Sequence, residues 1–278
     1  MPEKWTKSQL QELAKDMEDL IERLPLQPAA GVQRPTIARF ESLTQELKRR
    51  LSNLEPARPP ASYFDPSDPR MFGIFAALVL VGQEKLPMVE LRSHRFYGSG
   101  VYAIYYNGEF KPYSLISRTE HPIYVGKADP KAKHAENAKE QGEQLFGRLK
   151  DHKKNIGLAG NLELSDFRYR YLVVHTGWQV AAESALVNLF KPIWNKETKI
   201  CQGFGKHGDS TKTRANKRSP WDTLHPGRKW AYDDEVQDAA SVAEIGHRIS
   251  AHLTEHPPLE AAEDILHELM TRVSLRPS

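Results

Sequence analysis

The sequence predicts a mixed α/β (α+β) fold in which a small sheet is flanked by helices. Three observations support this prediction. Apolar residues recur at helical spacing near both ends of the chain. Between residues 100 and 175, short runs of β-branched and aromatic residues are typical of strands. The chain has 278 residues, of which 39% are hydrophobic and 27% charged, as in an ordinary globular protein.

The first 57 residues predict an N-terminal helical hairpin. Apolar side chains repeat every three or four residues over positions 10–24 and again over 37–54, with a Pro/Gly-rich turn at 25–35 between them. We expect residues 1–57 to form an appended pair of helices that packs on the body of the protein or on a partner subunit. The five prolines of residues 55–70 predict a linker.

Three strands are expected in the middle of the chain. Residues 101–106 form a run of β-branched and aromatic residues, and Asn107-Gly108 after it predicts a hairpin turn. Residues 123–125 predict a second strand, which we expect to end at Gly126. Residues 168–175 alternate with a period of two and predict a third.

Helices are expected around these strands. Apolar spacing predicts one helix over 143–154 and another over 179–190. Residues 196–230 are rich in Gly, Pro, Lys and Arg without periodicity, and therefore predict loops. Two closing helices are expected over 242–253 and 259–269.

Basic residues are concentrated in one segment. Residues 199–229 carry eight Lys and Arg against two Asp, a net charge of +6, although the whole chain carries only +3. Residues 231–278 carry three basic against ten acidic residues, a net charge of −7. Such a segment in a nearly balanced chain is typical of a nucleic-acid contact. Beyond the hairpin we therefore divide the chain into a core at 70–200, basic recognition loops at 201–230 and C-terminal helices at 231–278.

Several classes of protein are excluded by what the sequence lacks. Its longest apolar stretch, residues 74–82, is too short to cross a membrane, and its first residues contain no apolar core of a secretion signal. Cys201 is the single cysteine, so an internal disulfide and a cysteine-based zinc site are excluded. We expect a cytoplasmic protein that does not associate with membranes.

One carboxylate stands on the apolar side of a predicted helix. Val180, Val187 and Phe190 define the apolar stripe of residues 179–190, and Glu183 falls inside it. An unpaired charge there would cost several kcal/mol to desolvate, so Glu183 needs a cation. The sequence leaves open whether that cation belongs to a buried salt bridge, or whether Glu183 is a metal ligand or a general acid or base.

The helix predicted over residues 143–154 has a similar feature. Leu145 and Leu149 define its stripe, and Arg148 and His152 lie on the same side, four residues apart. A single Arg beside such a stripe is usually a side chain that extends to solvent. An Arg and a His together suggest a functional site.

The candidate residues contain one hard oxygen ligand, one guanidinium and several proton carriers, without an evident Ser or Cys nucleophile. This combination suits metal-assisted phosphodiester hydrolysis. A Mg²⁺ ion on the carboxylate would neutralise the scissile phosphate and the leaving oxygen, and the guanidinium would stabilise the pentacovalent charge. The set is Tyr102, Tyr124, Arg148, His152 and Glu183.

The same residues resemble a known family. Gly100-Val101-Tyr102 and Tyr124-Val125-Gly126 are similar to the two halves of the GIY-YIG nuclease signature. The stretch from Phe190 to Asn195 is similar to the Asn motif of that family. The resemblance covers roughly residues 70–230 and implies a small, mostly antiparallel central sheet. The further residues that match in order are Arg148, His152, Glu183 and Asn195.

A second resemblance is more specific. Residues 203–207 and 219–228 resemble a subgroup of type II restriction enzymes that cut the palindrome CCGCGG. The chain departs from minimal family members by a longer gap between its two signature halves, which predicts an inserted hairpin at residues 107–121. A palindromic target implies a two-fold assembly on double-stranded DNA, either a homodimer or a tetramer, and the terminal helices are candidate subunit contacts.

The resemblance implies a tyrosine that takes the proton of the attacking water. We assign this role to Tyr102, with Tyr124 as a hydrogen-bonding partner on the phosphate or the water, although the sequence does not decide which tyrosine is the base. A free phenol has a pKa near about 10 and is a poor base at neutral pH. His152 would accept the phenolic proton, and Lys127 or the metal would stabilise the phenolate.

The remaining motif residues complete the expected reaction. Glu183 binds Mg²⁺, and Asn195 orients the Glu183 helix or the phosphate. The products would carry 5′-phosphate and 3′-hydroxyl ends.

The basic segment would then contact DNA. Its side chains would meet phosphates, and some would reach guanine N7 and O6 in the major groove. Trp221 and His225 are expected to anchor this segment rather than to stack on bases, and a solvated surface loop is the alternative. The candidate DNA-binding residues are Lys199, Lys206, His207, Lys212, Arg214, Lys217, Arg218 and Arg228.

Two alternatives remain. A homing or repair nuclease would use the same domain, but would usually join it to a separate DNA-binding domain. A non-catalytic DNA-binding protein would have lost some catalytic positions, whereas all of them are present.

Overall fold

The computed structural model separates into two compact units, which divide after residue 61. In the first unit, α1 (Lys7–Glu22) and α2 (Arg34–Leu54) are the two predicted helices. Thr6 caps α1 through a capping box with Gln9. None of the described residues in these two helices is buried. The described residues are 5–26, 31, 33–54, 57, 65, 68–93, 95–205, 217–232 and 236–272.

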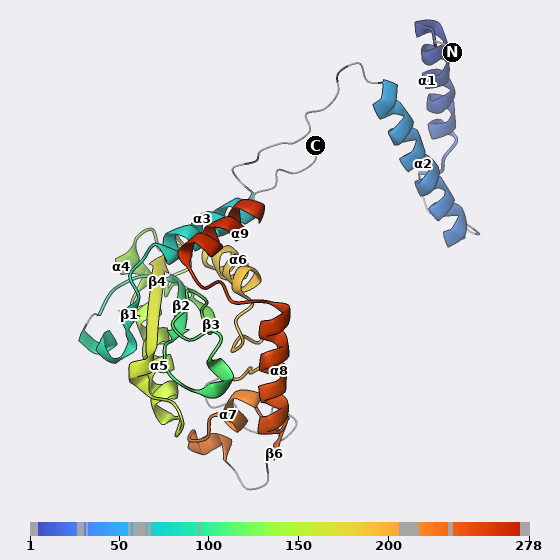
Figure 1. Cartoon of the computed structure of the whole chain (residues 1–278). Coiled ribbons are helices and arrows are strands. Elements are labelled where there is room, and N and C mark those ends of the chain that lie inside the picture. The colour runs from blue at the N-terminus through green and yellow to red at the C-terminus, as the bar shows by residue number, and fades with distance from the viewer. Residues whose placement is uncertain are drawn as a thin grey trace. The chain divides into compact units, whose positions relative to one another are not determined.

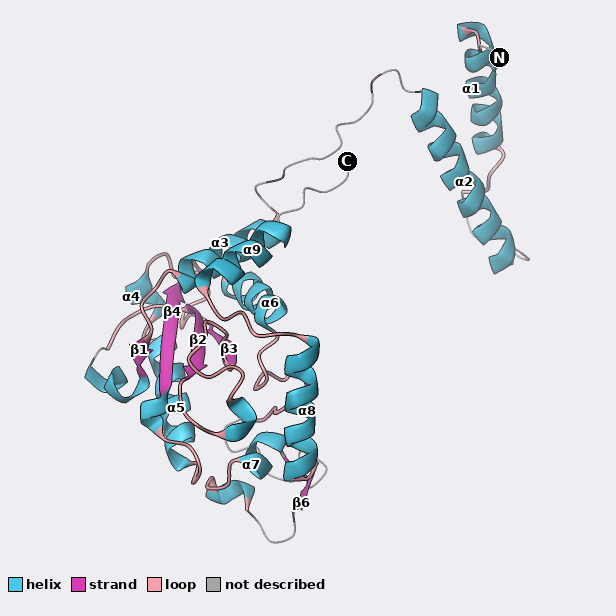
Figure 2. Ribbon diagram, viewed as in Figure 1, coloured by secondary structure: helices cyan, strands magenta, loops and turns pink. Residues whose placement is uncertain are grey.

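The second unit is built on a four-stranded sheet, which confirms the predicted fold class. Its strands lie in the order β1 (Leu86–Pro87), β4 (Phe167–Val173), β2 (Gly100–Tyr106) and β3 (Tyr124–Ala128), and every neighbouring pair is antiparallel (Figure 2). All residues of β2 are buried, because strands flank it on both sides. β3 is an edge strand, and this position decides where the site lies.

Two cores cover the two faces of the sheet. The even-numbered side chains of β2 enter one core with α5 (Gln144–Leu158) and α8 (Val242–Glu255). The odd-numbered ones enter a second core with α3 (Pro69–Val81), α6 (Gln179–Phe190) and α9 (Ala262–Arg272). Figure 1 shows these last three helices gathered together. Side chains alternate across a strand, so one strand serves both cores.

The closest helix contact of the second core requires a glycine. A Cβ atom added at Gly73 of α3 would overlap the Cβ of Ala185 on α6. The two helix backbones can therefore approach closely only because residue 73 has no side chain. This contact holds α6, the helix that carries Glu183, close against α3.

Two predictions about the middle of the chain are wrong. β3 does not end at Gly126 but continues through it to Ala128, because this glycine makes room for a neighbouring ring rather than a turn. Residues 107–121 do not form a hairpin. They contain a 3₁₀ helix, η2 (Lys111–Tyr113), and Asn107 donates its backbone N–H to Asp166 instead of closing a tight turn.

The predicted helices are found with changed ends, and the loops contain more structure than expected. α5 extends to Leu158 rather than residue 154, and the apolar stretch after residue 70 is the helix α3. Residues 196–230 contain β5 (Lys217–Arg218) and α7 (Pro220–Leu224), because Ser219 caps α7 at the backbone N–H of Asp222. The remaining elements are η1 (Met88–Ser93), α4 (Ala138–Gln141), η3 (Leu164–Asp166), η5 (Lys229–Ala231) and β6 (Gln237–Asp238).

β5 and β6 form a separate two-stranded parallel sheet. α8 and α9 confirm the two closing helices. In the described part of the chain, no helix has both the length and the apolar character needed to traverse a bilayer.

Candidate active site

A cavity of about 850 Å³ opens along the edge strand β3. Because β3 has no further strand beside it, α5 from one face of the sheet and α6 from the other both reach this edge. Arg148 of α5 and Glu183 of α6 line the cavity together with Tyr124 of β3. The fold thus brings three residues of the predicted set to one cavity wall, although the first and last of them are 59 positions apart in the sequence.

Behind this wall lies a buried tyrosine–histidine pair. The hydroxyl of Tyr102 lies 2.6 Å from Nε2 of His152, and neither side chain is exposed to solvent. Tyr102 points into the core on the α5 side of the sheet, and His152 shares the buried face of α5 with Leu145 and Leu149. The helical spacing predicted from the sequence is therefore confirmed for His152.

A glycine makes this geometry possible. Gly126 faces Tyr102 in the β2–β3 register, so the two positions share one side of the sheet. A Cβ atom at position 126 would lie 2.5 Å from the Tyr102 hydroxyl oxygen and 3.0 Å from Cε1 of Tyr124. The Tyr102 ring can thus pack over β3 at Gly126, because this residue has no side chain.

Both phenols are held in the neutral form. Burial raises the pKa of Tyr102 well above its usual value, nearby Tyr124 raises it further, and Arg148 lowers it. Burial also raises the pKa of Tyr124 to about 12, although the positive charge of Arg148 lowers it. Tyr124 lines the cavity, whereas Tyr102 does not. Neither phenol can therefore ionise at neutral pH without a group that takes its proton.

The apolar stripe predicted for α6 is confirmed for Val187 and Phe190, which are buried, but is wrong for Val180, which is 56% exposed. Ala182 and Leu186 complete the buried face of the helix. Glu183 is half-buried at the border of that face and points to the cavity. Burial raises the pKa of its carboxyl, and the positive charge of Lys127 lowers it.

A hard divalent cation fits this carboxylate. Asp129 and Glu197 also line the cavity, and their negative charges raise the pKa of Glu183 further. Within the described residues, no group of three or more His, Cys, Asp or Glu could hold a metal by itself. Mg²⁺ is commonly bound by one or two carboxylates together with substrate phosphates, so it does not require a complete protein cage.

Asn195 has a different contact from the one expected. Its side chain accepts a hydrogen bond from the backbone N–H of Val125 (2.9 Å) and donates one to the Val125 carbonyl (2.8 Å). Both of these groups lie on the open edge of β3 and would otherwise lack a strand partner. Asn195 therefore fixes the strand that carries Tyr124. It also lines the cavity, and its expected contact with the phosphate stays a prediction.

Of the predicted base-reading residues, Arg228 is corrected by the structure. Its guanidinium is completely buried, pairs with Asp222 at 2.7 Å and lies 4.3 Å from the centre of the Trp221 ring. A side chain held in this way cannot reach a base. Arg218 lines the cavity, where it pairs with Asp238 at 2.6 Å and lies over the Tyr232 ring.

Other basic residues remain available for DNA. Lys217 is exposed at the cavity and Lys199 is exposed on the surface. Four predicted DNA-binding residues lie outside the described residues, namely Lys206, His207, Lys212 and Arg214. Trp221 and His225 are completely buried, which confirms that they anchor the segment.

Several residues of the site were not identified from the sequence. Gln144 and Lys196 line the cavity, and no periodicity or motif marks either of them. Phe204 stacks on His152, with ring centroids 4.5 Å apart and planes 19° apart. Phe204 lies within the quoted motif of residues 203–207, but a phenylalanine in a loop does not show by itself which ring it covers.

The comparisons agree with this arrangement. Residues 94–253, more than half of the chain, match the family described as the Eco29kI GIY-YIG domain. This match spans the sheet strands β2, β3 and β4 together with α5 and α6, and so contains every side chain of the cavity wall named above. No curated protein matches the chain.

Proposed function

The chain belongs to the Eco29kI GIY-YIG family, a restriction endonuclease family whose domain implies DNA cleavage, and from this premise we propose that it is a type II enzyme. It would hydrolyse both strands of a palindromic GC-rich site, CCGCGG, in a Mg²⁺-dependent reaction that leaves 5′-phosphate and 3′-hydroxyl ends. It would act as the nuclease of a restriction–modification system.

The observation that best supports this proposal is the composition of the cavity wall. Arg148, Glu183 and Tyr124 line one space of about 850 Å³, and the Tyr102–His152 pair lies directly behind Tyr124. A guanidinium and a metal-binding carboxylate can stabilise the charge of phosphodiester hydrolysis, and a phenol with an adjacent base can take up the proton of the attacking water. A protein that only binds DNA has no need of them in one place.

The proton of the attacking water would leave through the tyrosines. The Tyr102 hydroxyl can donate to Nε2 of His152 at 2.6 Å, and so can itself accept a proton from the cavity side. Because Tyr124 carries the phenol at the wall, it would either orient the water or pass the proton on to Tyr102. Because burial raises the pKa of both phenols, a proton that leaves either of them needs an acceptor, and the imidazole of His152 lies next to Tyr102.

Charge on the scissile phosphate would be balanced by two groups. Arg148 would donate paired hydrogen bonds to the phosphate oxygens, as guanidinium groups commonly do. Glu183 would hold the Mg²⁺ ion, with Asp129 or Glu197 near it. When bound, Mg²⁺ supplies a positive charge that stabilises the developing negative charge on the phosphate and the leaving oxygen.

DNA contact would follow from the basic residues around the cavity. Lys196 and Lys217 are exposed there and would meet phosphates. The resemblance of residues 203–207 and 219–228 to CCGCGG-cutting enzymes supports that target. Because the target is palindromic, we propose a homodimer, or a tetramer of two such dimers, with one site for each strand.

The test is digestion of a plasmid that carries CCGCGG sites, with Mg²⁺ and with EDTA. Wild type and the variant Glu255→Gln, which changes an exposed carboxylate on α8, should yield the same discrete fragments in Mg²⁺ alone. Glu183→Gln should yield none. The fragment ends should accept ligation directly, which requires a 5′-phosphate.

Other outcomes would separate the alternatives. Discrete fragments with another map would reject the target sequence and keep the enzyme. Nicked circles without linear product would indicate a repair-type nuclease. No cleavage of any DNA by wild type, with DNA retained in a gel-shift assay, would indicate a non-catalytic binding protein.

A further inference from the structure

We propose that Phe204 is a positioning residue for the reaction, and that the buried Asp222–Arg228 pair holds it against His152. This inference rests on the proposed nuclease function. It assigns a catalytic purpose to a segment that the sequence suggests is only a DNA-binding loop.

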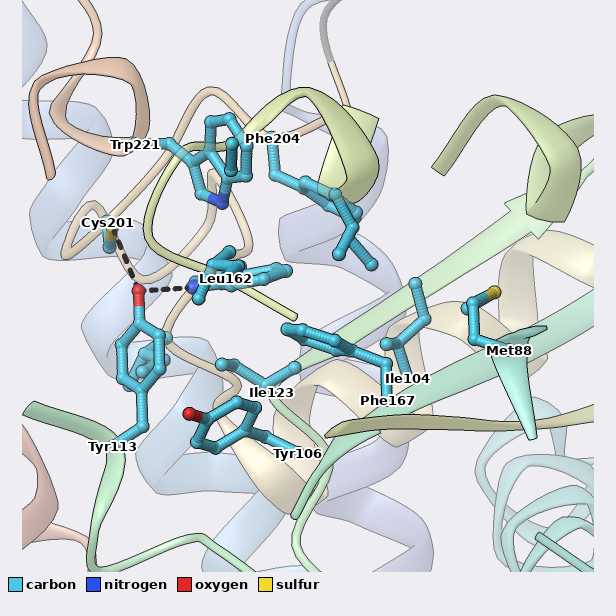
Figure 3. Packing of buried hydrophobic residues seen from close by; sticks show 14 of the residues in the cluster. Met88, Ile104, Tyr106, Tyr113, Ile123, Leu162, Phe167, Cys201, Phe204 and Trp221 are labelled. Carbon is cyan, nitrogen blue, oxygen red and sulfur yellow. Dashed lines mark hydrogen bonds between the residues drawn. The ribbon is translucent and has the colours of Figure 1, made fainter. Parts of the chain in front are cut away.

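Phe204 forms one wall of the imidazole site. Its ring is completely buried and lies nearly parallel to the ring of His152. It also meets Tyr124 edge to face, with centroids 5.1 Å apart and planes 75° apart. One side chain thus contacts the phenol at the cavity wall and the histidine behind it. Figure 3 shows Phe204 beside Trp221 in the same cluster of buried side chains.

The backbone around Phe204 is held by a buried ion pair. Arg228 donates from Nη1 to the carbonyl of Phe204 (3.1 Å) and from Nη2 to the carbonyl of Gly203 (3.0 Å). Its Nε donates to Asp222 at 2.7 Å, and both charged side chains are completely buried. The position of the Phe204 ring therefore depends on residues 18 and 24 positions further along the chain.

A second contact ties the same backbone to the helix of the histidine. Asn155 donates from Nδ2 to the Phe204 carbonyl at 3.3 Å. Asn155 and His152 lie three residues apart on α5, one turn of the helix. The same helix therefore carries His152 and fixes the backbone of Phe204, whose ring covers the imidazole.

This packing has two chemical consequences. An imidazole between a parallel ring and the helix cannot rotate freely, so Nε2 stays directed at the Tyr102 hydroxyl. When His152 accepts the phenolic proton, the imidazolium lies over the face of an aromatic ring, which attracts a cation. Phe204 would therefore lower the barrier to proton transfer without touching DNA.

The test compares the full-length variants Phe204→Leu and Phe204→Tyr with wild type in single-turnover cleavage of bound DNA. Leucine keeps an apolar side chain but removes the ring, and tyrosine keeps the ring. We expect Phe204→Leu to reduce the cleavage rate roughly 10- to 100-fold, as small misplacements of catalytic groups do. Its Kd for DNA should change by less than about twofold, since no DNA contact is lost. Phe204→Tyr should keep most of the rate.

Phe167→Leu is the matched control. Phe167 is equally buried in the same core cluster, but its ring contacts Tyr106 and Trp194 instead of His152. A second readout is the NMR signal of the His152 Cε1–H group, assigned with His152→Gln. The ring current of Phe204 should displace this signal in wild type. The displacement should be lost in Phe204→Leu and kept in Phe167→Leu.

Each outcome has one meaning. An active wild type with an unchanged rate in Phe204→Leu would overturn the positioning role, and so would equal losses in both leucine variants. A wild type that cleaves no DNA would instead contradict the proposed function. A Phe204→Leu protein that loses cleavage together with DNA affinity would place Phe204 in DNA binding and overturn the inference.

Discussion

The hydroxyl oxygen of Tyr102 lies 2.6 Å from Nε2 of His152, and both side chains are completely buried. The pair connects the central strand of the sheet to α5, the helix that also carries Arg148 to the cavity. Burial alone would make Tyr102 an inert core phenol with a raised pKa. The adjacent imidazole of His152 can accept the proton of the Tyr102 hydroxyl.

The first prediction concerns this pair as a unit. Tyr102→Phe and His152→Ala should each reduce the single-turnover rate by about 10² to 10⁴, the usual contribution of a positioned acid or base. The double variant should lose little more than either single one, because residues that act together are not additive. His247→Ala, which changes an exposed histidine of α8, should keep the wild-type rate. If the fold-loss in rate of the double variant instead equalled the product of the two single losses, Tyr102 and His152 would have independent roles.

The second prediction concerns the pH dependence of stability at Glu183. Burial raises the pKa of this carboxyl, so the folded state holds its proton more tightly than the unfolded chain does. Stability therefore falls as pH rises from the unfolded pKa through the raised folded pKa, and the ionised carboxyl is a cost above that window. Without metal, Glu183→Gln should raise Tm at pH 7 and lose this advantage near pH 4. Thermal denaturation with EDTA at both pH values measures it.

Mg²⁺ should reverse this order at neutral pH. A cation that binds only the folded ionised site raises Tm by mass action. Wild type should gain in Tm with Mg²⁺, whereas Glu183→Gln should not. An equal gain in both proteins would place the metal elsewhere.

The third prediction concerns the glycine opposite Tyr102. Gly126→Ala would put a Cβ atom 2.5 Å from the Tyr102 hydroxyl oxygen and 2.6 Å from its Cζ. The ring must shift, which should cost about 1–3 kcal/mol in the free energy of unfolding and should abolish most of the cleavage activity. Urea denaturation and the plasmid assay measure the two effects.

Gly157 is the control for that substitution. It lies in α5, and a Cβ atom there would meet nothing within 4 Å. Gly157→Ala should therefore be neutral, or should stabilise the protein by roughly 0.5–1 kcal/mol, because alanine is the better helix former. A stable and active Gly126→Ala would contradict the argument from steric space.

The fourth prediction separates a buried from an exposed cation. Arg228→Met would leave the completely buried Asp222 without its cation, and should cost about 3–5 kcal/mol of stability. Adding Asp222→Leu should restore part of that loss, since it removes the remaining charge. Urea denaturation of the two variants checks both expectations.

Lys217→Ala should behave in the opposite way. Lys217 is exposed at the cavity, so its removal should leave stability within about 0.5 kcal/mol of wild type. DNA affinity should fall, and the slope of log K against log salt should become shallower by about one. An unchanged slope would remove Lys217 from the DNA contact.

Much of the secondary structure and of the site was predictable from local patterns. Helical spacing correctly predicted α1, α2, α8 and α9, and the apolar side of α5 correctly included His152. The order of the motif residues singled out Tyr124, Arg148 and Glu183, which the fold brings to one cavity. These features depend on residues a few positions apart, which a sequence displays directly.

Only the tertiary structure decided which polar side chains bind other groups of the protein and which stay accessible. Arg228 has the same formal charge as the exposed Lys217, but Asp222 and two loop carbonyls bury it. The side chain of Asn195 hydrogen-bonds to the backbone of Val125 on the open edge of β3, 70 positions away along the chain. Phe204 covers His152 across 52 positions. The identity of a residue sets what bonds it can make, but its partners are chosen by the packing of distant segments, and that choice separates a DNA contact from a structural pair.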